Sequence, residues 1–181
     1  MNPTATVLPG PSTRHGAVDV LVCGNADRGD DGAPIAAAPL LDWLLASPGH
    51  LRVVGELDVT HLCSIPDDDG LVIVDAATGL EPGAIAMLRL DDAGAYGSRI
   101  RPRSSHALPI PEVVAIANTL RGQPLDGRIV VIGGIRFGLG EPLSDAVGRA
   151  IPELALNVWR AVAVVHAERA ARDATNRSGE A

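Results

Sequence analysis

The chain has no lysine, few aromatic residues and only two cysteines. All 15 of its basic residues are arginine, and they are spread along 181 positions against 22 acidic residues, which leaves a net charge of −7. A nucleic-acid partner is not expected, because phosphate binding needs basic residues concentrated on one face. Aromatic residues make up 2% of the chain, so valine, isoleucine, leucine and alanine must fill the core.

Long apolar runs are also missing. No stretch approaches the roughly 18 uncharged apolar residues of a membrane helix, and "MNPTATVLPGPSTRHG" has no apolar core of the kind a signal peptide needs. We therefore expect a cytoplasmic protein with no membrane partner. In a reducing cytosol Cys23 and Cys63 are expected to be free thiols. With His61 they would offer zinc ligands, but the C-x-x-C spacing typical of zinc sites is missing.

The length predicts one domain. Residues 1–16 contain three prolines with Ser, Thr and Gly and are expected to form a flexible leader. The single domain is predicted to cover residues 17–173, and residues 174–181 are expected to be a disordered tail.

Apolar segments alternate with helical segments along this domain. Short apolar or β-branched runs predict strands, and prolines at N-terminal turns with a glycine beyond a C-terminus mark helices. Strands are predicted at 18–23, 51–57, 70–78, 83–90 and 127–138. Helices are predicted from Pro34, kinked or divided into two at Pro39, from 108 to 121, and from Leu143 to about Arg172, capped by Ser144 and restarted at Pro152. This order predicts a three-layer α/β/α sandwich with a mainly parallel, mixed sheet of about five strands.

Acidic and imidazole side chains follow several of the predicted strands. Asp30 and Asp31 follow the first strand, Asp75 ends the third, and His106 follows a long loop at 91–105. Loops at the carboxyl ends of parallel strands share one edge, where ligands bind. Two carboxylates and an imidazole would suit a divalent first-row ion such as nickel or zinc.

Simpler roles for the same residues remain open. Either Asp30 or Asp31 could cap the helix opened by Pro34, Asp75 could bond a turn, and His106 could pack against its helix. The stretch "GNADRGDDG" lacks the G-x-G-x-x-G spacing of dinucleotide sites and places carboxylates where a pyrophosphate would need N–H groups.

Four segments, in order, resemble the hydrogenase maturation proteases. "VLVCGNADRGDDG" is similar to the family's opening strand, Gly-Asn and acidic pair, and "GLVIVDAATGLEPGAI" to its strand ending in Asp-Ala with a Pro-Gly turn. "SSHALPIPEVVAIANTLRG" is similar to its histidine before a helix, and "GRIVVIGGIRFGLGEPLSDAVGRAIPE" to its closing strand, link and helix. The resemblance covers about residues 17 to 165.

The resemblance implies an aspartic-type endopeptidase that removes the C-terminal extension of a nickel-iron hydrogenase large-subunit precursor after nickel insertion. It implies that Asp31, Asp75 and His106 are both the metal ligands and the catalytic residues. Nickel would be presented by the substrate, and another divalent ion such as zinc or cadmium could bind the isolated protein. The partner implied is the precursor, and we expect a monomer because the acidic edge must stay open to it.

Two features depart from the family. Many members carry Glu where this chain has Asp31, and a glycine-rich "D-G-G-T" segment is replaced by "ELDVTHLC" at 56–63, which retains Thr60. A non-catalytic, metal-dependent chaperone of the precursor would use the same three residues. A small-molecule-binding α/β domain is the third hypothesis.

Overall fold

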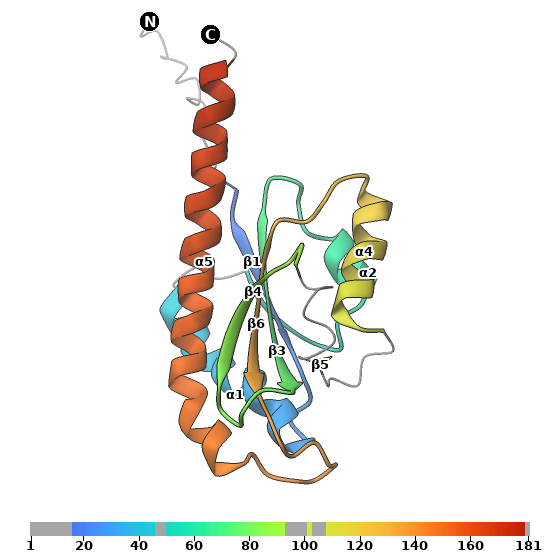
Figure 1. Ribbon diagram of the computed structural model, residues 1–181, viewed down its shortest axis with the longest axis vertical. Coiled ribbons are helices and arrows are strands. Elements are labelled where there is room, and N and C mark those ends of the chain that lie inside the picture. The colour runs from blue at the N-terminus through green and yellow to red at the C-terminus, as the bar shows by residue number, and fades with distance from the viewer. Residues whose placement is uncertain (1–15, 46–49, 93–100, 103–107, 180–181) are drawn as a thin grey trace, which may run out of the picture.

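The structure is a computed structural model that describes residues 16–45, 50–92, 101–102 and 108–179 (Figure 1). Its strands are β1 (Val18–Cys23), β2 (Leu51–Gly55), β3 (Gly70–Thr78), β4 (Ile85–Arg89), β5 (Arg101–Pro102) and β6 (Gly127–Gly133). Its helices are the 3-10 helix η1 (Gly29–Gly32), α1 (Ala33–Leu45), α2 (Val59–Cys63), α4 (Ile110–Arg121) and α5 (Asp145–Gly179).

The strands form one mixed, mostly parallel sheet in the order β2-β1-β3-β6-β4. The pairs β1–β2, β1–β3 and β3–β6 are parallel, whereas β4 runs antiparallel to β6. β5 pairs antiparallel with Ala77 and Thr78 at the end of β3. The predicted α/β sandwich with a mainly parallel sheet is confirmed.

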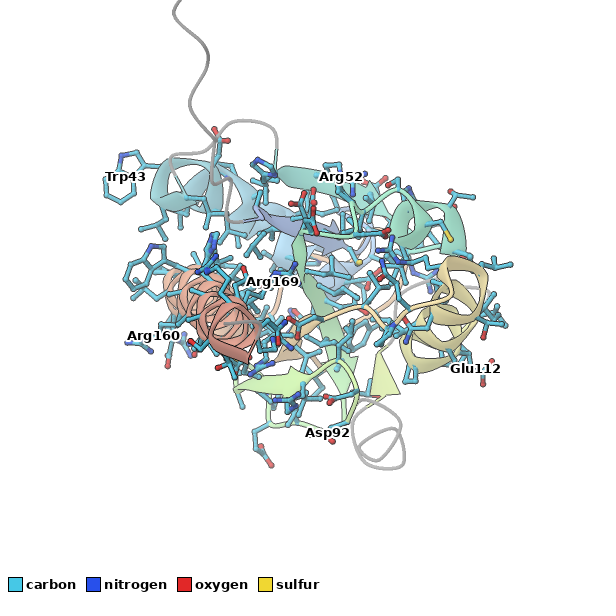
Figure 2. The ribbon with its side chains drawn as sticks, turned by 90° about the horizontal axis from the view of Figure 1, so that it is seen from above. Trp43, Arg52, Asp92, Glu112, Arg160 and Arg169 are labelled. Atoms are coloured by element: carbon cyan, nitrogen blue, oxygen red, sulfur yellow. The ribbon has the colours of Figure 1, made fainter. Side chains whose placement is uncertain are left out.

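Helices cover both faces of the sheet, as Figure 2 shows by looking down on it. Alternate strand residues point to opposite faces. In β1, Val18, Val20 and Val22 pack with α1 and α5, while Leu21 and Cys23 pack with the α2 and α4 side. The three central strands β1, β3 and β6 are almost wholly buried, which explains their continuous apolar sequences.

Helix boundaries follow their local signals in part. α4 has a proline in its first turn and ends at Gly122, whose φ of 71° is the left-handed conformation typical of a glycine helix end. α1 is one helix through Pro39, preceded by η1. α2 was not predicted; Asp58 caps it, because its carboxylate accepts hydrogen bonds from the Thr60 and His61 backbone N–H groups.

Two predicted boundaries near the end of the chain are wrong. β6 ends at Gly133 instead of residue 138, because the next backbone groups bond elsewhere, as described below. α5 is continuous through Pro152 and reaches Gly179, so residues 174–179 extend a helix where a tail was expected. Buried contacts of Leu154, Ala155 and Val158 hold the helix beyond the proline.

Ionic contacts tie the second half of α5 to β6 and the residue before it. Arg128 of β6 pairs with Glu168 at 2.5 Å, and Arg169 and Arg172 both pair with Asp126. Figure 2 shows Arg169 pointing from α5 toward the sheet. Within the ranges described, no helix is long and apolar enough to cross a membrane.

Candidate functional site

The site begins at the turn after β1. Gly24 has a φ of +120°, and a Cβ atom there would lie 2.1 Å from the carbonyl oxygen of Asp31. Only glycine therefore lets η1 fold back so closely onto the end of the strand. The turn is held by Asn25 N–H donating to the same Asp31 carbonyl at 3.2 Å, and by Gly24 N–H donating to the Gly55 carbonyl at 2.9 Å.

Asp30 is fully buried and fixes the loop between β6 and α5. Its Oδ2 accepts hydrogen bonds from the backbone N–H groups of Ile135 at 2.8 Å and Arg136 at 2.9 Å, and its Oδ1 accepts one from Ser144 at 2.6 Å. Burial alone would raise the pKa of Asp30, but these N–H groups lower it below the ordinary aspartate value. Asp30 is therefore an ionised structural clamp, and its loop cannot continue β6.

Asp31, the next residue, lies in the opposite environment. It is fully buried, and neither carboxylate oxygen accepts a well-formed hydrogen bond from the described residues. Burial raises the pKa of Asp31 to about 6, although Arg28 and the Asn25 backbone oppose the rise. A buried carboxylate without donors is unfavourable unless a partner reaches it, so these oxygens fit a cation or donor that comes from outside the chain.

Asp75 lies on β3 just past the end of its pairing with β1, which runs to Val22 and Val74. It is fully buried, and its Oδ1 accepts a hydrogen bond from the Ala76 N–H at 2.9 Å. η1 packs against β3. The thiol of Cys23, at the end of β1, is also buried, and its pKa is raised by burial and further by the negative charges of Asp75 and Asp31. The structure thus brings the two predicted carboxylates to the same edge of the sheet.

The third predicted residue, His106, lies outside the described residues. In the described part of the chain, the group of three side chains placed to hold a metal is a different one, Asp19, His50 and Asp69. That group lies at the opposite, amino-terminal edge of the sheet.

The weaker zinc hypothesis gains nothing from the structure. Cys23 and Cys63 are both free, the first buried and the second exposed. The His61 Nδ1 accepts a hydrogen bond from the Asp58 N–H at 3.2 Å. These side chains serve the core and the capping of α2.

The altered segment at 56–63 forms this capped turn. Asp58 Oδ1 also accepts a hydrogen bond from the Thr60 hydroxyl at 2.6 Å, and this bond is the main cause of the lowered pKa of Asp58. α2 packs against α4. The Thr60 hydroxyl is therefore used inside the cap.

The role of Asp30 is not revealed by the sequence, where it is a candidate both for the acidic edge and for a helix cap, whereas in the structure it holds the loop between β6 and α5. Nothing near it in the sequence predicts its partners, because they come from residues 135–144. The paired "DD" was the one signal available: two adjacent acids cannot both cap one short helix.

Solved structures with a similar fold are hydrogenase maturation proteases. The [NiFe] hydrogenase maturation protease HybD from Thermococcus kodakarensis is 23% identical, with 80% of this chain and 97% of that chain covered and a TM-score of 0.65. The hydrogenase maturating endopeptidase HybD from E. coli is 19% identical, covering 78% and 89%, with a TM-score of 0.61. The protease HycI from Thermococcus kodakarensis KOD1 is 23% identical, covering 83% and 94%, with a TM-score of 0.59.

No protein-family model and no curated protein sequence matches the chain. The similarity is thus one of structure at low sequence identity. The chain has the fold of the [NiFe] hydrogenase maturation proteases.

Proposed function

We propose that the chain is an endopeptidase that removes the C-terminal extension of a nickel-iron hydrogenase large-subunit precursor after nickel has been inserted. Asp31, Asp75 and His106 recognise the bound nickel and take part in cleavage. The protein acts as a monomer in the cytoplasm. Support comes from structures of the same fold that are named as hydrogenase maturation proteases, and from two buried carboxylates at the edge where such a fold binds ligands.

The observation that carries the proposal is Asp31, buried and without a well-formed hydrogen bond from the described residues. Natural proteins rarely retain a buried, unpaired carboxylate unless it has a use. Oxygen ligands from Asp31 and Asp75 with an imidazole from His106 suit a divalent first-row ion. Three protein ligands leave coordination positions that the precursor's own nickel ligands fill, so the nickel is part of the substrate.

Each element of the site has a separate task. The Gly24 turn and the Asp30 clamp hold η1 against β3, which keeps Asp31 beside Asp75. Both carboxylates would bind the nickel carried by the precursor and so hold the peptide near it in the site. A metal held there would act as a Lewis acid on the scissile carbonyl and would activate a water for attack. A precursor without nickel brings no cation to pair with the buried carboxylates. It therefore does not bind in the site and is not cleaved.

The test is to incubate the purified chain with nickel-loaded and nickel-free large-subunit precursors from its own source, and to follow precursor mass. We expect loss of a C-terminal peptide from the loaded form alone. Asp31→Asn, Asp75→Asn and His106→Ala should each lower the processing rate by at least about 100-fold, because loss of a metal ligand costs more than the roughly 10- to 100-fold of an outer hydrogen-bond partner.

Cys63→Ser is the matched control, since the thiol is free and exposed, and it should process the precursor at the normal rate. Normal cleavage by any two of the three ligand variants would remove the metal site from the mechanism. Precursor binding without any loss of mass would instead support the chaperone function.

A further inference from the structure

A second group of ligating side chains lies at the amino-terminal edge of the sheet, away from Asp31 and Asp75. Asp19 is the second residue of β1, His50 immediately precedes β2, and Asp69 immediately precedes β3. β1 pairs with both of those strands, so the sheet itself brings the three residues together. One ligand atom from each lies within 4.8 Å of the others.

Each member of this group is held in place by backbone contacts. The His50 carbonyl accepts a hydrogen bond from the Val20 N–H at 2.7 Å, which fixes the start of β2 against β1. Asp69 Oδ1 accepts one from the Ala17 N–H at 2.8 Å, and the Ala17 carbonyl accepts one from the Gly70 N–H at 2.7 Å. The ligand positions are therefore set by the sheet before any ion binds.

One buried nitrogen of the group has no partner among the described residues, and its two carboxylates carry like charges. Asp19 is only 7% exposed, and its charged partner among the described residues is Arg52, whose Nη2 lies 3.8 Å from its Oδ1. The His50 Nδ1 is buried and has no hydrogen-bond partner in the described part of the chain. Burial raises the pKa of Asp19 and the nearby Asp69 raises it further, whereas Arg52 and His50 lower it. Two carboxylates that repel each other beside an unsatisfied imidazole form a set that a cation would complete.

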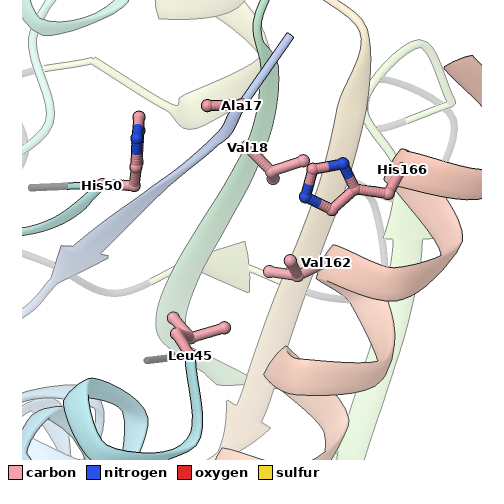
Figure 3. A pocket seen from close by; sticks show the side chains of 6 residues that line it. All are labelled: Ala17, Val18, Leu45, His50, Val162 and His166. Atoms are coloured by element: carbon pink, nitrogen blue, oxygen red, sulfur yellow. The ribbon is translucent and has the colours of Figure 1, made fainter. Parts of the chain in front are cut away.

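Space is present beside the histidine. A cavity of about 150 Å³ is lined by His50 and His166 with Ala17, Val18, Leu45 and Val162. Figure 3 shows that its two histidines approach from different elements, His50 from the segment before β2 and His166 from α5. The hollow leaves room for solvent next to the His50 ring.

We propose that Asp19, His50 and Asp69 form a divalent-cation site that joins the starts of β1, β2 and β3. Two carboxylate oxygens and one imidazole nitrogen suit zinc or another divalent first-row ion. The Arg52 guanidinium competes for Asp19 and keeps the affinity modest. This site has a structural role and does not depend on the proposed protease activity.

The test uses the full chain in the Asp31→Asn/Asp75→Asn background, so that the two carboxylates proposed as ligands at the other edge of the sheet are absent. After treatment with a chelator and its removal, Zn²⁺ binding is measured by calorimetry and Co²⁺ binding by its visible absorption. We expect one equivalent of each ion and an increase in Tm when Zn²⁺ is added. Adding His50→Ala or Asp69→Asn should abolish both the binding and the Tm increase.

His166→Ala is the matched control, because it changes the other histidine of the same cavity without touching the group, and it should retain full binding. Equal binding by the His50→Ala and His166→Ala proteins would overturn the proposal, as would a background protein that binds no ion. If the double variant does not fold, the same measurement is made on the wild-type protein. Asp69→Asn should then lower the number of Zn²⁺ ions bound per chain by one. An unchanged number of bound ions would overturn the proposal. Precursor processing by His50→Ala should stay normal.

Discussion

At the scale of single residues, Asp30 and Asp31 are chemically identical neighbours with opposite electrostatics. Both are fully buried, yet Asp30 accepts three backbone hydrogen bonds, whereas Asp31 accepts none of good geometry from the described residues. The pKa of the first is lowered and that of the second is raised to about 6. One residue therefore stabilises the folded chain as an anion, and the other destabilises it.

Asp31→Asn should stabilise the chelator-treated protein at pH 8. The pKa of Asp31 rises from 3.8 to about 6 on folding, so its contribution to stability is complete below pH 4 and is lost as the pH rises through 6. Removing the charge should recover up to about 3 kcal/mol of the free energy of unfolding at pH 8, less whatever the new amide costs when buried. Urea unfolding at pH 8 and pH 4 measures the difference.

The gain should largely disappear at pH 4, where wild-type Asp31 is protonated in the folded chain and still partly ionised in the unfolded chain. Equal destabilisation at both pH values would mean that the carboxylate makes a favourable contact within the protein, and this would contradict its assignment as an unpaired ligand.

Asp30→Asn should destabilise the protein. An amide cannot accept all three N–H bonds, so at least one buried donor is left unpaired at a cost of about 1–3 kcal/mol. Amide hydrogen exchange at Ile135, Arg136 and Ser144 should accelerate. Asp42→Asn, at an exposed position of α1, should leave stability and exchange unchanged, and a similar loss in both variants would rule out a specific clamp.

At the scale of elements, the sequence predicts those strand and helix boundaries that depend on neighbouring residues. β1 and β3 have the predicted bounds because a strand buried on both faces is apolar at most positions, which makes the run recognisable in the sequence. The end of α4 at Gly122 can be predicted because it depends only on the local backbone conformation. The end of β6 at Gly133 depends on Asp30, more than 100 residues earlier, and no local pattern contains that information.

The site, too, can be predicted from the sequence only where it depends on neighbouring residues and strand order. The strand order places Asp31 and Asp75 at one edge, and the structure bears this out, but the unequal roles of Asp30 and Asp31 depend on a loop that reaches them from the other end of the chain. The continuity of α5 through Pro152 likewise depends on packing against the sheet, which outweighs the lost backbone hydrogen bond.

The Gly24 turn provides a test of how tightly η1 is held. Gly24→Ala would place a methyl group 2.1 Å from the Asp31 carbonyl oxygen, at a φ of +120°. We expect η1 to shift, with a loss of at least about 2–3 kcal/mol in the free energy of unfolding and a fall in precursor processing. Chemical denaturation and the precursor mass assay measure the two effects.

Gly122→Ala separates backbone strain from collision. Gly122 also has a positive φ, but nothing lies within 4 Å of the position of an added Cβ. Its cost should be limited to about 1–2 kcal/mol of left-handed strain, with normal processing. Equal losses of stability and processing in the two alanine variants would show that the close contact with Asp31 is unimportant.

At the scale of the whole molecule, the two edges of one sheet carry different ligand sets. The carboxyl edge holds Asp31 and Asp75 near the turn after β1, and the amino edge holds Asp19, His50 and Asp69. β1 contributes to both, because Asp19 and Cys23 lie near its two ends. Metal binding at the amino edge would thus stabilise the strand whose other end supports the proposed active site.

The end of α5 projects beyond the body of the domain (Figure 1), and residues 171–178 are exposed. Deleting residues 173–181 should change the free energy of unfolding by no more than about 0.5 kcal/mol, because Arg169 and Arg172 remain to pair with Asp126. Deleting residues 165–181 removes the buried Val165 and the Glu168 partner of Arg128, and should cost at least about 2 kcal/mol. Thermal unfolding of both proteins measures this, and equal losses would contradict it.

The Asp30 clamp also determines when the acidic turn can take its final form. Its carboxylate bonds to backbone groups 105, 106 and 114 residues further along the chain. On a ribosome that adds about 5–20 residues per second, those groups are made roughly 5–20 seconds after Asp30 itself. During this interval the strand and turn near the N-terminus can form without a fixed position for Asp31. The newly made chain therefore has no fixed position for the Asp31 carboxylate until synthesis has reached the residue before α5.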